Sequence, residues 1–144
     1  ICKQQLLLAK HYDLPVILHC RKAHNELIQL LQQVRLPRGG VLHGFSGSSQ
    51  LGMQYIKLGF KLGIGGVITY PRAVKTRQAV SELPLTSLLL ETDSPDMPIL
   101  GYQGLRNEPA NIAEVLKILT KLRKEPEELI AKANYSSFTE LFMS

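Results

Sequence analysis

A chain of 144 residues, of which 44% are hydrophobic and 20% charged, has the composition of one globular domain rather than of a disordered segment. No apolar run approaches the roughly 18–20 residues of a membrane span, and no secretory signal pattern is visible. The net charge of +5 permits a polyanionic partner such as nucleic acid but does not establish one. Two cysteines form neither a disulfide framework nor a metal motif, so we expect a reducing, cytoplasmic setting.

Short apolar runs alternate with amphipathic segments along the chain. The first residues look like the middle of a helix, and the apolar runs predict buried strands at 14–20, 39–47, 60–68 and 86–92. Helical spacing predicts intervening helices at 23–34, 49–59 and 71–83, the last with Pro71 in its first turn. Two more helices follow, behind Pro109 and near Pro126, and for the second we expect a buried stripe of Leu129, Ile130, Ala133, Phe138 and Leu141.

This alternation predicts an α/β fold, with a parallel sheet covered by helices. Strands that are apolar throughout are typical of sheets buried on both faces. Both a doubly wound sheet and a (β/α) barrel satisfy the pattern. In either architecture the functional residues lie at the carboxyl ends of the strands.

Polar residues do collect at the expected strand ends. The first strand ends with His19 and the second with His43, while the fourth ends with Glu91 and Asp93. Each residue alone is weak evidence, because a single strand histidine is more often a core residue and a single aspartate is often a helix cap. Their coincidence at one edge of one sheet is more specific. The other two histidines, at positions 11 and 24, lie near helix ends and receive no role.

Imidazole and carboxylate ligands together favour zinc, manganese or a similar divalent ion. Such an ion lowers the pKa of a bound water from 15.7 to about 7. We expect His19, His43 and Asp93 to hold the metal, with Asp93 also taking a proton from water. Glu91 lies two residues from Asp93, which places both on one side of a regular strand. It would orient a ligand from behind, although a structural ion pair explains it equally well.

Five segments in this order resemble the TatD family of metal-dependent deoxyribonucleases, and most closely its YjjV-type branch: LPVILHCRKA, VLHGFSG, GIGGVITY, LLLETDSPDMP and GLRNEPANI. The resemblance covers essentially the whole chain. It implies a TIM-type barrel of the metallo-dependent hydrolase superfamily, whose fifth-, sixth- and eighth-strand metal ligands correspond to His19, His43 and Asp93. More weakly, it implies that Arg21 and Arg106 contact the phosphate of a substrate.

The resemblance also implies ligands that this chain lacks: an H-x-H pair on the first barrel strand and a glutamate on the fourth. We therefore expect residues 1–144 to form a single, partial hydrolase domain equivalent to the second half of a barrel, with the N-terminal strands missing. Three explanations stay open: a fragment of a longer protein, the product of a truncated gene, or a half-barrel that pairs with a second copy.

The leading functional hypothesis is a divalent-metal phosphodiester hydrolase that degrades DNA, as a deoxyribonuclease or 3′–5′ exonuclease. The alternatives are an amidohydrolase acting on a C–N or ester bond of a small molecule, and an inactive remnant that binds nucleic acid weakly through charge. The basic residues Arg72, Lys75 and Arg77 would steer the DNA backbone under the first hypothesis, although a solvated helix face explains them more simply.

Overall fold

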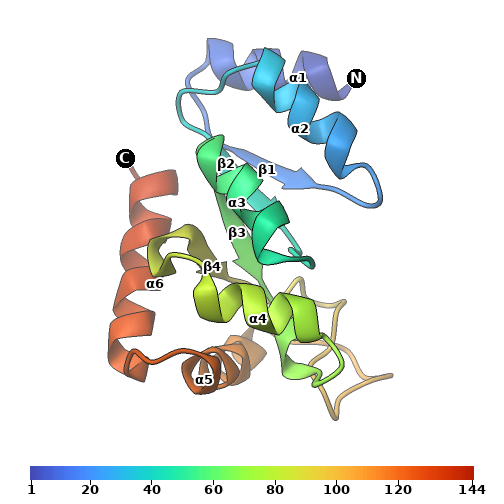
Figure 1. Cartoon of the computed structure of the whole chain (residues 1–144), viewed down its shortest axis with the longest axis vertical. Helices are drawn as coiled ribbons and strands as arrows, with labels where there is room; N and C mark the ends of the chain where they lie inside the picture. Colours follow the sequence, from blue (N-terminus) through green and yellow to red (C-terminus); the bar gives the residue numbers. More distant parts are fainter.

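The computed structural model describes all residues, 1–144, and contains one four-stranded sheet with six α-helices around it (Figure 1). The elements in chain order are α1 (Cys2–His11), β1 (Val16–His19), α2 (His24–Gln33), β2 (Gly40–His43), α3 (Ser49–Lys57), β3 (Phe60–Ile64), η1 (Gly66–Thr69), α4 (Val74–Glu82), η2 (Leu85–Ser87), β4 (Leu88–Leu90), η3 (Pro109–Asn111), α5 (Ile112–Leu122) and α6 (Glu127–Phe142). None of the helices is both long and apolar enough to cross a membrane.

The four strands pair in the order β1-β2-β3-β4, and every pair is parallel. Consecutive strands are therefore neighbours, and each of the three connections includes a helix. The predicted α/β fold of parallel βα units is confirmed. All four carboxyl ends meet at one rim of the sheet, so the loops that follow the strands are brought together there.

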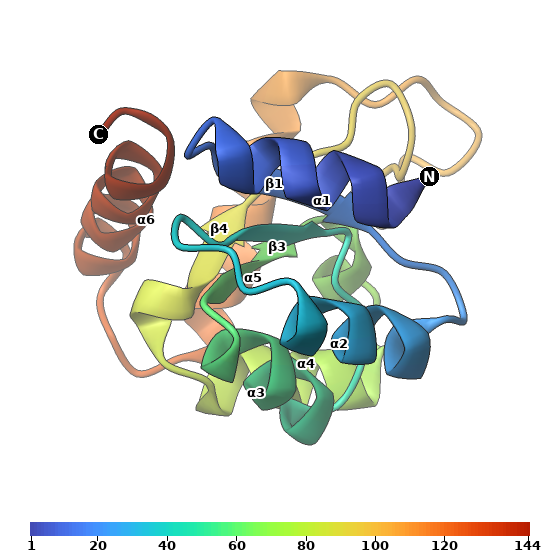
Figure 2. The ribbon, with the colours of Figure 1, turned by 90° about the horizontal axis from the view of Figure 1, so that it is seen from above.

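The outer face of the sheet carries a row of leucines that pair across all four strands in register: Leu18, Leu42, Leu62 and Leu88. All four are buried, and they belong to a core cluster of 20 residues that includes side chains from α2, α3, α4, α5 and α6. In the view of Figure 2, α2, α3 and α4 lie together below the sheet. Successive side chains of a strand point to opposite faces, so the leucine row fixes which residues face the other way.

The inner face is covered much less. Val41 and Leu89 pack against Leu141 near the C-terminal end of α6 in a separate cluster of three buried residues. Ile17, on the β1 edge of the same face, is 67% exposed. At the β4 edge, the side chain of Asn134 from α6 accepts a hydrogen bond from the backbone N–H of Leu90 at 2.9 Å, which satisfies an edge donor that has no neighbouring strand.

Several element boundaries differ from the sequence-based expectations. The run at 60–68 is a strand only as far as Ile64 and continues as the short helix η1, because Gly65 leaves the ladder. Helix α4 begins at Val74 rather than at Pro71, which lies in the preceding turn. The stripe expected along α6 is partly wrong, since Leu129 and Phe138 are about half exposed while Ile130 and Leu141 are buried.

Candidate metal centre

Two histidines lie side by side at the rim because β1 and β2 end in register. The Cα atoms of His19 and His43 are direct partners in the parallel ladder. Both follow an inward-facing residue by two positions, Ile17 in β1 and Val41 in β2, so both project from the inner face. Their ring centroids are 5.9 Å apart, at an interplanar angle of 37°.

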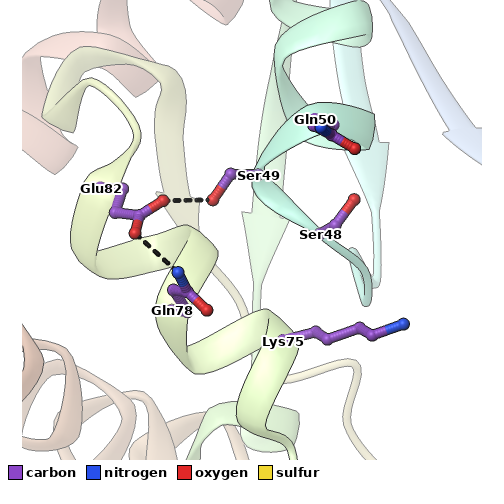
Figure 3. Close-up of a pocket in the computed structure, with 6 residues that line it drawn as sticks. All are labelled: Ser48, Ser49, Gln50, Lys75, Gln78 and Glu82. Carbon is purple, nitrogen blue, oxygen red and sulfur yellow. Dashed lines mark hydrogen bonds between the residues drawn. The ribbon is translucent and has the colours of Figure 1, made fainter.

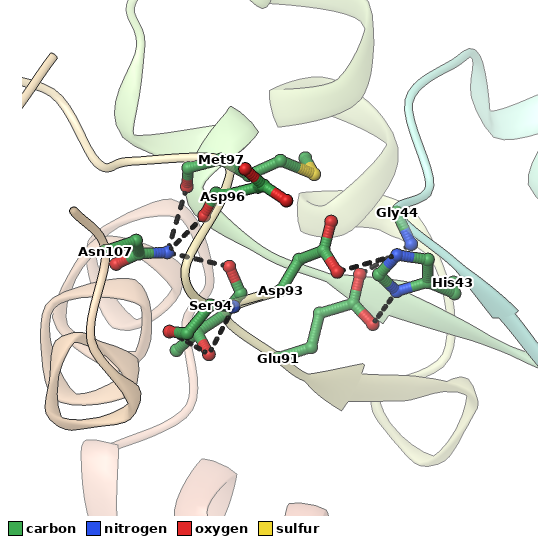
Figure 4. A network of polar contacts seen from close by, with 9 residues as sticks. His43, Gly44, Glu91, Asp93, Ser94, Asp96, Met97 and Asn107 are labelled. Atoms are coloured by element: carbon green, nitrogen blue, oxygen red, sulfur yellow. Dashed lines mark hydrogen bonds and ion pairs between the residues drawn. The ribbon is translucent and has the colours of Figure 1, made fainter. Parts of the chain in front are cut away.

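His43 lies between two carboxylates, one on each ring nitrogen (Figure 4). Its Nδ1 is 3.0 Å from Oε2 of Glu91, and its Nε2 is 3.2 Å from Oδ1 of Asp93. Glu91 also accepts a hydrogen bond from the backbone N–H of Gly44 through Oε1 at 2.5 Å. The two acids that follow β4 therefore contact the same imidazole at the end of β2.

Glu91 reaches His43 by passing over β3, and Gly63 makes this path available. A Cβ atom at position 63 would overlap the carboxylate of Glu91. The backbone N–H of Glu91 continues the ladder by donating to the carbonyl of Ile64 at 3.0 Å, so the side chain starts from a fixed point. The sequence signal was present as a glycine inside an apolar strand, which often marks a close approach of another group, but it did not identify that group as Glu91.

Asp93 does not continue the strand. β4 ends at Leu90, and Asp93 adopts a φ of +57°, in the left-handed region. A turn follows in which the N–H of Asp96 donates to the carbonyl of Asp93 at 2.9 Å. The expectation that a regular strand would carry both acids to the same side is therefore wrong. A left-handed backbone position, which aspartate tolerates better than most residues, directs Asp93 toward His43.

Asn107 holds this turn in place and was missed by the sequence analysis. Its side chain is buried, and its Nδ2 lies 2.8 Å from the carbonyl oxygens of Thr92 and Asp96 and 3.2 Å from that of Met97 (Figure 4). Its Oδ1 accepts from the backbone N–H of Glu108 at 3.0 Å. Asn107 lies in the segment GLRNEPANI, which contributed to the family resemblance, but only the fold brings its side chain to the Asp93 turn.

The two carboxylates change the protonation of His43. Partial burial, the largest single influence, lowers the pKa of His43. The hydrogen bond and charge of Glu91 and those of Asp93 outweigh it, so the pKa lies above its ordinary value of 6.5. A hydrogen bond from Nδ1–H to Glu91 leaves Nε2 as the nitrogen that faces Asp93, which is the arrangement that commonly orients a metal-binding histidine.

His43 and Asp93 have the ligand chemistry of a divalent-cation site, but they are only two ligands. No set of three or more histidine, cysteine, aspartate or glutamate side chains is close enough together to hold a metal ion. The pair of His43 Nε2 and Asp93 Oδ1, however, is 3.2 Å apart. Two ligands at about 2.1 Å from one tetrahedral ion are separated by about 3.4 Å. This pair is therefore spaced like two ligands of one ion, and His19 is the nearest further imidazole, with its ring centroid 5.9 Å from that of His43.

The expected phosphate-binding arginines are at the rim but are not engaged. Arg21 follows β1, and Arg106 lies in the long loop after β4; both side chains are exposed and neither forms an ion pair. The basic residues after β3 do not act as one group. Arg77 donates to the carbonyl of Ile68 at 3.0 Å, and Arg72 lies over the ring of Tyr70. Arg72, Lys75 and Arg77 therefore do not form one charged helix face.

A polar cavity of about 290 Å³ lies between α3 and α4, lined by Ser48, Ser49, Gln50, Lys75, Gln78 and Glu82 (Figure 3). Its polar groups bond to one another: Gln78 and Ser49 donate to Glu82 at 2.9 and 2.7 Å. These two hydrogen bonds lower the pKa of Glu82, with Gln78 the larger influence. The cavity contains none of the rim residues, so it is a separate feature of the helix layer.

The two remaining histidines have structural surroundings. His24 Nδ1 is 2.8 Å from the hydroxyl of the buried Tyr55, which ties the start of α2 to α3. Burial is the main cause that raises the pKa of this tyrosine, with a further contribution from Cys20. His11 lies edge-on to Tyr12 at a centroid distance of 4.8 Å. Neither histidine contacts the rim site.

Comparison with known proteins identifies the family. The family model described as "TatD related DNase" matches residues 1–143. The chain is 54% identical over 139 residues to the uncharacterized metal-dependent hydrolase YjjV of Escherichia coli K12, and 49% identical over 140 residues to an uncharacterized metal-dependent hydrolase of Haemophilus influenzae. These matches cover 96% and 97% of this chain but only 54% and 53% of the relatives.

Solved structures agree with the sequence matches. The crystal structure of the E. coli YjjV protein superimposes with a TM-score of 0.95 over 98% of this chain and 54% of that one, at 53% identity. A TatD-family hydrolase from Entamoeba histolytica has a TM-score of 0.81 at 23% identity, over 97% of this chain and 55% of that one, which supports the fold alone. The chain spans about half the length of the relatives it matches, and it belongs to the TatD-related DNase family.

Proposed function

We propose that this chain carries the C-terminal part of a divalent-metal-dependent phosphodiester hydrolase that acts on DNA, as a deoxyribonuclease or 3′–5′ exonuclease. The observation that carries the proposal is His43, with Glu91 at 3.0 Å from Nδ1 and Asp93 at 3.2 Å from Nε2. A carboxylate behind a histidine and a second carboxylate in front of it match the surroundings of metal-binding histidines. The family match and the names of the relatives support a metal-dependent hydrolase.

His19, His43 and Asp93 would hold the ion, which we expect to be zinc, manganese or magnesium. When bound, a divalent ion supplies Lewis-acid polarisation and lowers the pKa of water at the site. Glu91 keeps the proton of His43 on Nδ1, so that Nε2 stays available as a ligand. Asp93, at 38% side-chain exposure, accepts the proton that the attacking water loses.

A phosphodiester substrate agrees with the charge at the rim. Arg21 and Arg106 are exposed, lack carboxylate partners and follow the ends of β1 and β4. Free guanidinium groups bind phosphate oxygens in bidentate fashion. The net charge of +5 favours binding of a polyanion, because basic side chains that contact its phosphates release the counterions bound to the polyanion. These features favour nucleic acid over an uncharged amide or lactone.

The site has only part of a usual ligand set, since no third ligand contacts the His43–Asp93 pair. The relatives are nearly twice as long as this chain. We therefore propose that further ligands come from outside residues 1–144, either from a complementary half of the barrel or from a second copy of the chain. The inner face of the sheet, exposed at Ile17, is the surface on which such a half would close.

The test measures metal binding and DNA cleavage by the purified chain and by His19→Ala, His43→Ala and Asp93→Ala variants. Calorimetric titration with Zn²⁺ and Mn²⁺ should give one dominant site, weakened at least tenfold by each substitution. Cleavage of end-labelled single-stranded DNA should depend on added metal and be abolished by a chelator. His11→Ala, which removes a histidine outside the rim, is the matched control and should leave both properties unchanged.

Equal metal affinity in His11→Ala and His43→Ala would contradict the site. A parallel panel of small amides, lactones and esters tests the runner-up activity, because the same ligands also serve amidohydrolases. Metal-dependent turnover of that panel without DNA cleavage would replace the nuclease proposal. Weak DNA binding that disappears with salt, together with no stoichiometric metal, would identify a non-catalytic remnant.

A further inference from the structure

A second cavity lies on the rim, beside the turn that carries Asp93. It has a volume of about 240 Å³ and is lined by Val67, Tyr70, Arg72, Ala73, Met97 and Pro98. Val67 belongs to η1, which follows β3, whereas Met97 and Pro98 follow β4. The cavity is therefore formed by segments that follow the carboxyl ends of two neighbouring parallel strands, and His43 lies at the carboxyl end of a third. Neither the family match nor the names of the relatives assign it a function.

The cavity combines apolar walls with one fixed aromatic ring and one cation. The hydroxyl of Tyr70 donates to the carbonyl of Pro98 at 2.7 Å, which ties the two walls together and orients the ring. The guanidinium carbon of Arg72 lies 5.3 Å from the centroid of that ring. Arg72 is exposed and takes part in none of the four ion pairs of the chain, so its charge is not neutralised.

The turn after β4 links this cavity to the metal centre along the chain, since it carries Asp93 at one end and Met97 and Pro98 at the other. Asp93 and Met97 are four residues apart, so their Cα atoms are separated by at most about 14 Å. The hydrogen bond from Asp96 N–H to the Asp93 carbonyl at 2.9 Å closes the turn, and Asn107 contacts the Met97 carbonyl at 3.2 Å. Figure 4 shows Asp93, Asp96 and Met97 on this single segment. If a substrate phosphate binds at Asp93, the nucleotide next to it would reach the cavity.

We propose that the Tyr70–Arg72 cavity is a nucleobase subsite, which binds the base next to the phosphodiester that is cleaved. The inference rests on the proposed function and specifies how the substrate is held. A base has a planar π-face that stacks on a guanidinium or an aromatic ring, and such stacking tolerates any base sequence. The apolar residues Val67, Ala73 and Met97 supply the dry walls, and the unpaired charge of Arg72 suits a ligand that also carries phosphate.

Charge complementarity favours a nucleotide over other occupants of this size. None of the six lining residues is acidic, and the guanidinium of Arg72 already lies over the Tyr70 ring, so a cationic ligand would meet a like charge without a counter-charge. An uncharged apolar ligand would leave Arg72 partly desolvated without a counter-charge, which is unfavourable. Lys75 is three residues away in sequence but lines the separate cavity between α3 and α4, so it provides a matched basic residue outside the subsite.

The experiment measures binding of a short single-stranded oligonucleotide in the presence of a chelator, so that no cleavage is needed. The oligonucleotide has 2-aminopurine at its 3′ end; anisotropy gives the affinity, and quenching of 2-aminopurine reports stacking. An otherwise identical oligonucleotide lacks that base. Arg72→Leu removes the charge and the stacking plane, Arg72→Lys keeps the charge alone, and Lys75→Ala removes a charge outside the cavity.

We expect Arg72→Leu and Arg72→Lys to weaken binding roughly 5- to 100-fold, the range that follows from the loss of one stacked base, and to abolish the quenching. For the abasic oligonucleotide, the affinities of both variants should differ less from that of the wild-type chain. The affinity of Arg72→Lys should be the closer to wild type, because this variant keeps the charge. Lys75→Ala should retain the quenching and lose less than about threefold in affinity. Unchanged quenching in Arg72→Lys, or equal losses in Arg72→Leu and Lys75→Ala, would overturn the subsite and leave only general charge attraction.

The outcome separates the subsite from the proposed activity. Stacking that depends on Arg72, without cleavage when metal is restored, would refute the nuclease and retain the subsite. Metal-dependent cleavage that is equally fast on intact and abasic DNA, in the unchanged chain and in both Arg72 variants, would refute the subsite and retain the nuclease. Absence of any DNA binding by the unchanged chain would refute both.

Discussion

The two faces of the sheet differ in composition and in surroundings, since Lys61 and Gly63 alternate with the outward-facing Leu62 along β3. On the outer face, Leu42 and Leu62 are buried among helices in a cluster of 20 residues. On the inner face, Val41 and Leu89 belong to a cluster of three, and Ile17 is mostly exposed. The rim residues His19, His43 and Glu91 project from this inner face, which is also the side on which a cavity of about 460 Å³ opens toward α6.

The difference separates what holds the chain together from what the rim does. Apolar burial contributes about 25 cal/mol per Å², and almost all of it is on the outer face. At the rim, polar contacts made by a few residues set the geometry, and most of these contacts are partly open to solvent. Substitutions on the outer face should therefore change stability, whereas substitutions at the rim should change the geometry of the site with less effect on stability.

The largest contrast is expected between Leu62→Ala and Ile17→Ala. Leu62 is 0% exposed at the centre of the sheet, so its truncation should cost about 2–5 kcal/mol in the free energy of unfolding. Truncation of Ile17, which is 67% exposed, should lower the free energy of unfolding by less than about 0.5 kcal/mol. Urea denaturation of both variants measures the difference. A large loss for Ile17→Ala that grows with protein concentration would reveal a second copy on the inner face.

Asn107→Ala should have the next largest effect. It removes the side chain that bonds to three backbone carbonyls around the Asp93 turn, and its site is buried at 3% exposure. Losing the hydrogen bonds of this buried amide should cost about 1–3 kcal/mol in the free energy of unfolding. Hydrogen exchange of residues 92–97 should accelerate more than that of the rest of the chain.

Asn111→Ala is the matched control for that experiment. It removes a hydrogen bond of 2.9 Å to Oδ1 of Asn107 but leaves the three carbonyl contacts intact. Protection of residues 92–97 should therefore persist in this variant. Equal acceleration in both variants would contradict the assignment of Asn107 as the residue that holds the turn.

Gly63→Ala should disturb the site with little loss of stability. The new Cβ would overlap the carboxylate of Glu91, which is the end of a flexible side chain and moves more easily than backbone. We expect a loss of about 1 kcal/mol in the free energy of unfolding, at the low end of the range for overpacking. The slowly exchanging Nδ1–H signal of His43, protected by Glu91, should disappear from the proton NMR spectrum. Its persistence would contradict the path of Glu91 over β3.

Glu125→Gln tests the outer helix layer and should have the smallest effect. Arg123 donates to the carbonyls of Val80 and Leu83 at 2.7 Å each and to Glu125 at the same distance. The hydrogen bond from Arg123 is the main cause that lowers the pKa of Glu125 below 4.5. Because the pKa of Glu125 is lower in the folded state, its contact with Arg123 stabilises the fold above pH 4.5. This stabilisation is lost as the pH falls through the folded-state pKa.

The loss in Glu125→Gln should therefore be a few tenths of a kcal/mol at pH 7, as for other ion pairs near the surface. This difference in stability should vanish in acid, because the carboxyl group of Glu125 in the wild-type chain is then protonated and uncharged, like the glutamine of the variant. Thermal unfolding of both proteins between pH 3 and pH 7 measures this. A difference that stays constant over the whole range would mean that the charge of Glu125 is not its cause.

The sequence by itself determined the parallel βα order and the rim as the place for polar residues. The period of apolar residues and the intervening breakers specify strands and helices locally, and chain connectivity then constrains the pairing. The residues His19, His43 and Asp93 came from the same argument, because consecutive parallel strands end at one edge. The proximity of His19 and His43 follows from the register of β1 and β2, whereas Asp93 lies beyond the end of β4.

Only the tertiary structure decided how each of the two acids reaches His43. Local sequence treated Glu91 and Asp93 as neighbours on one strand, but their directions depend on groups far away in the chain. Gly63 on β3 leaves space for Glu91, and Asn107 anchors the left-handed turn at Asp93. Sequence periodicity describes which face a residue occupies; it does not describe which distant backbone or side chain fills the space in front of it.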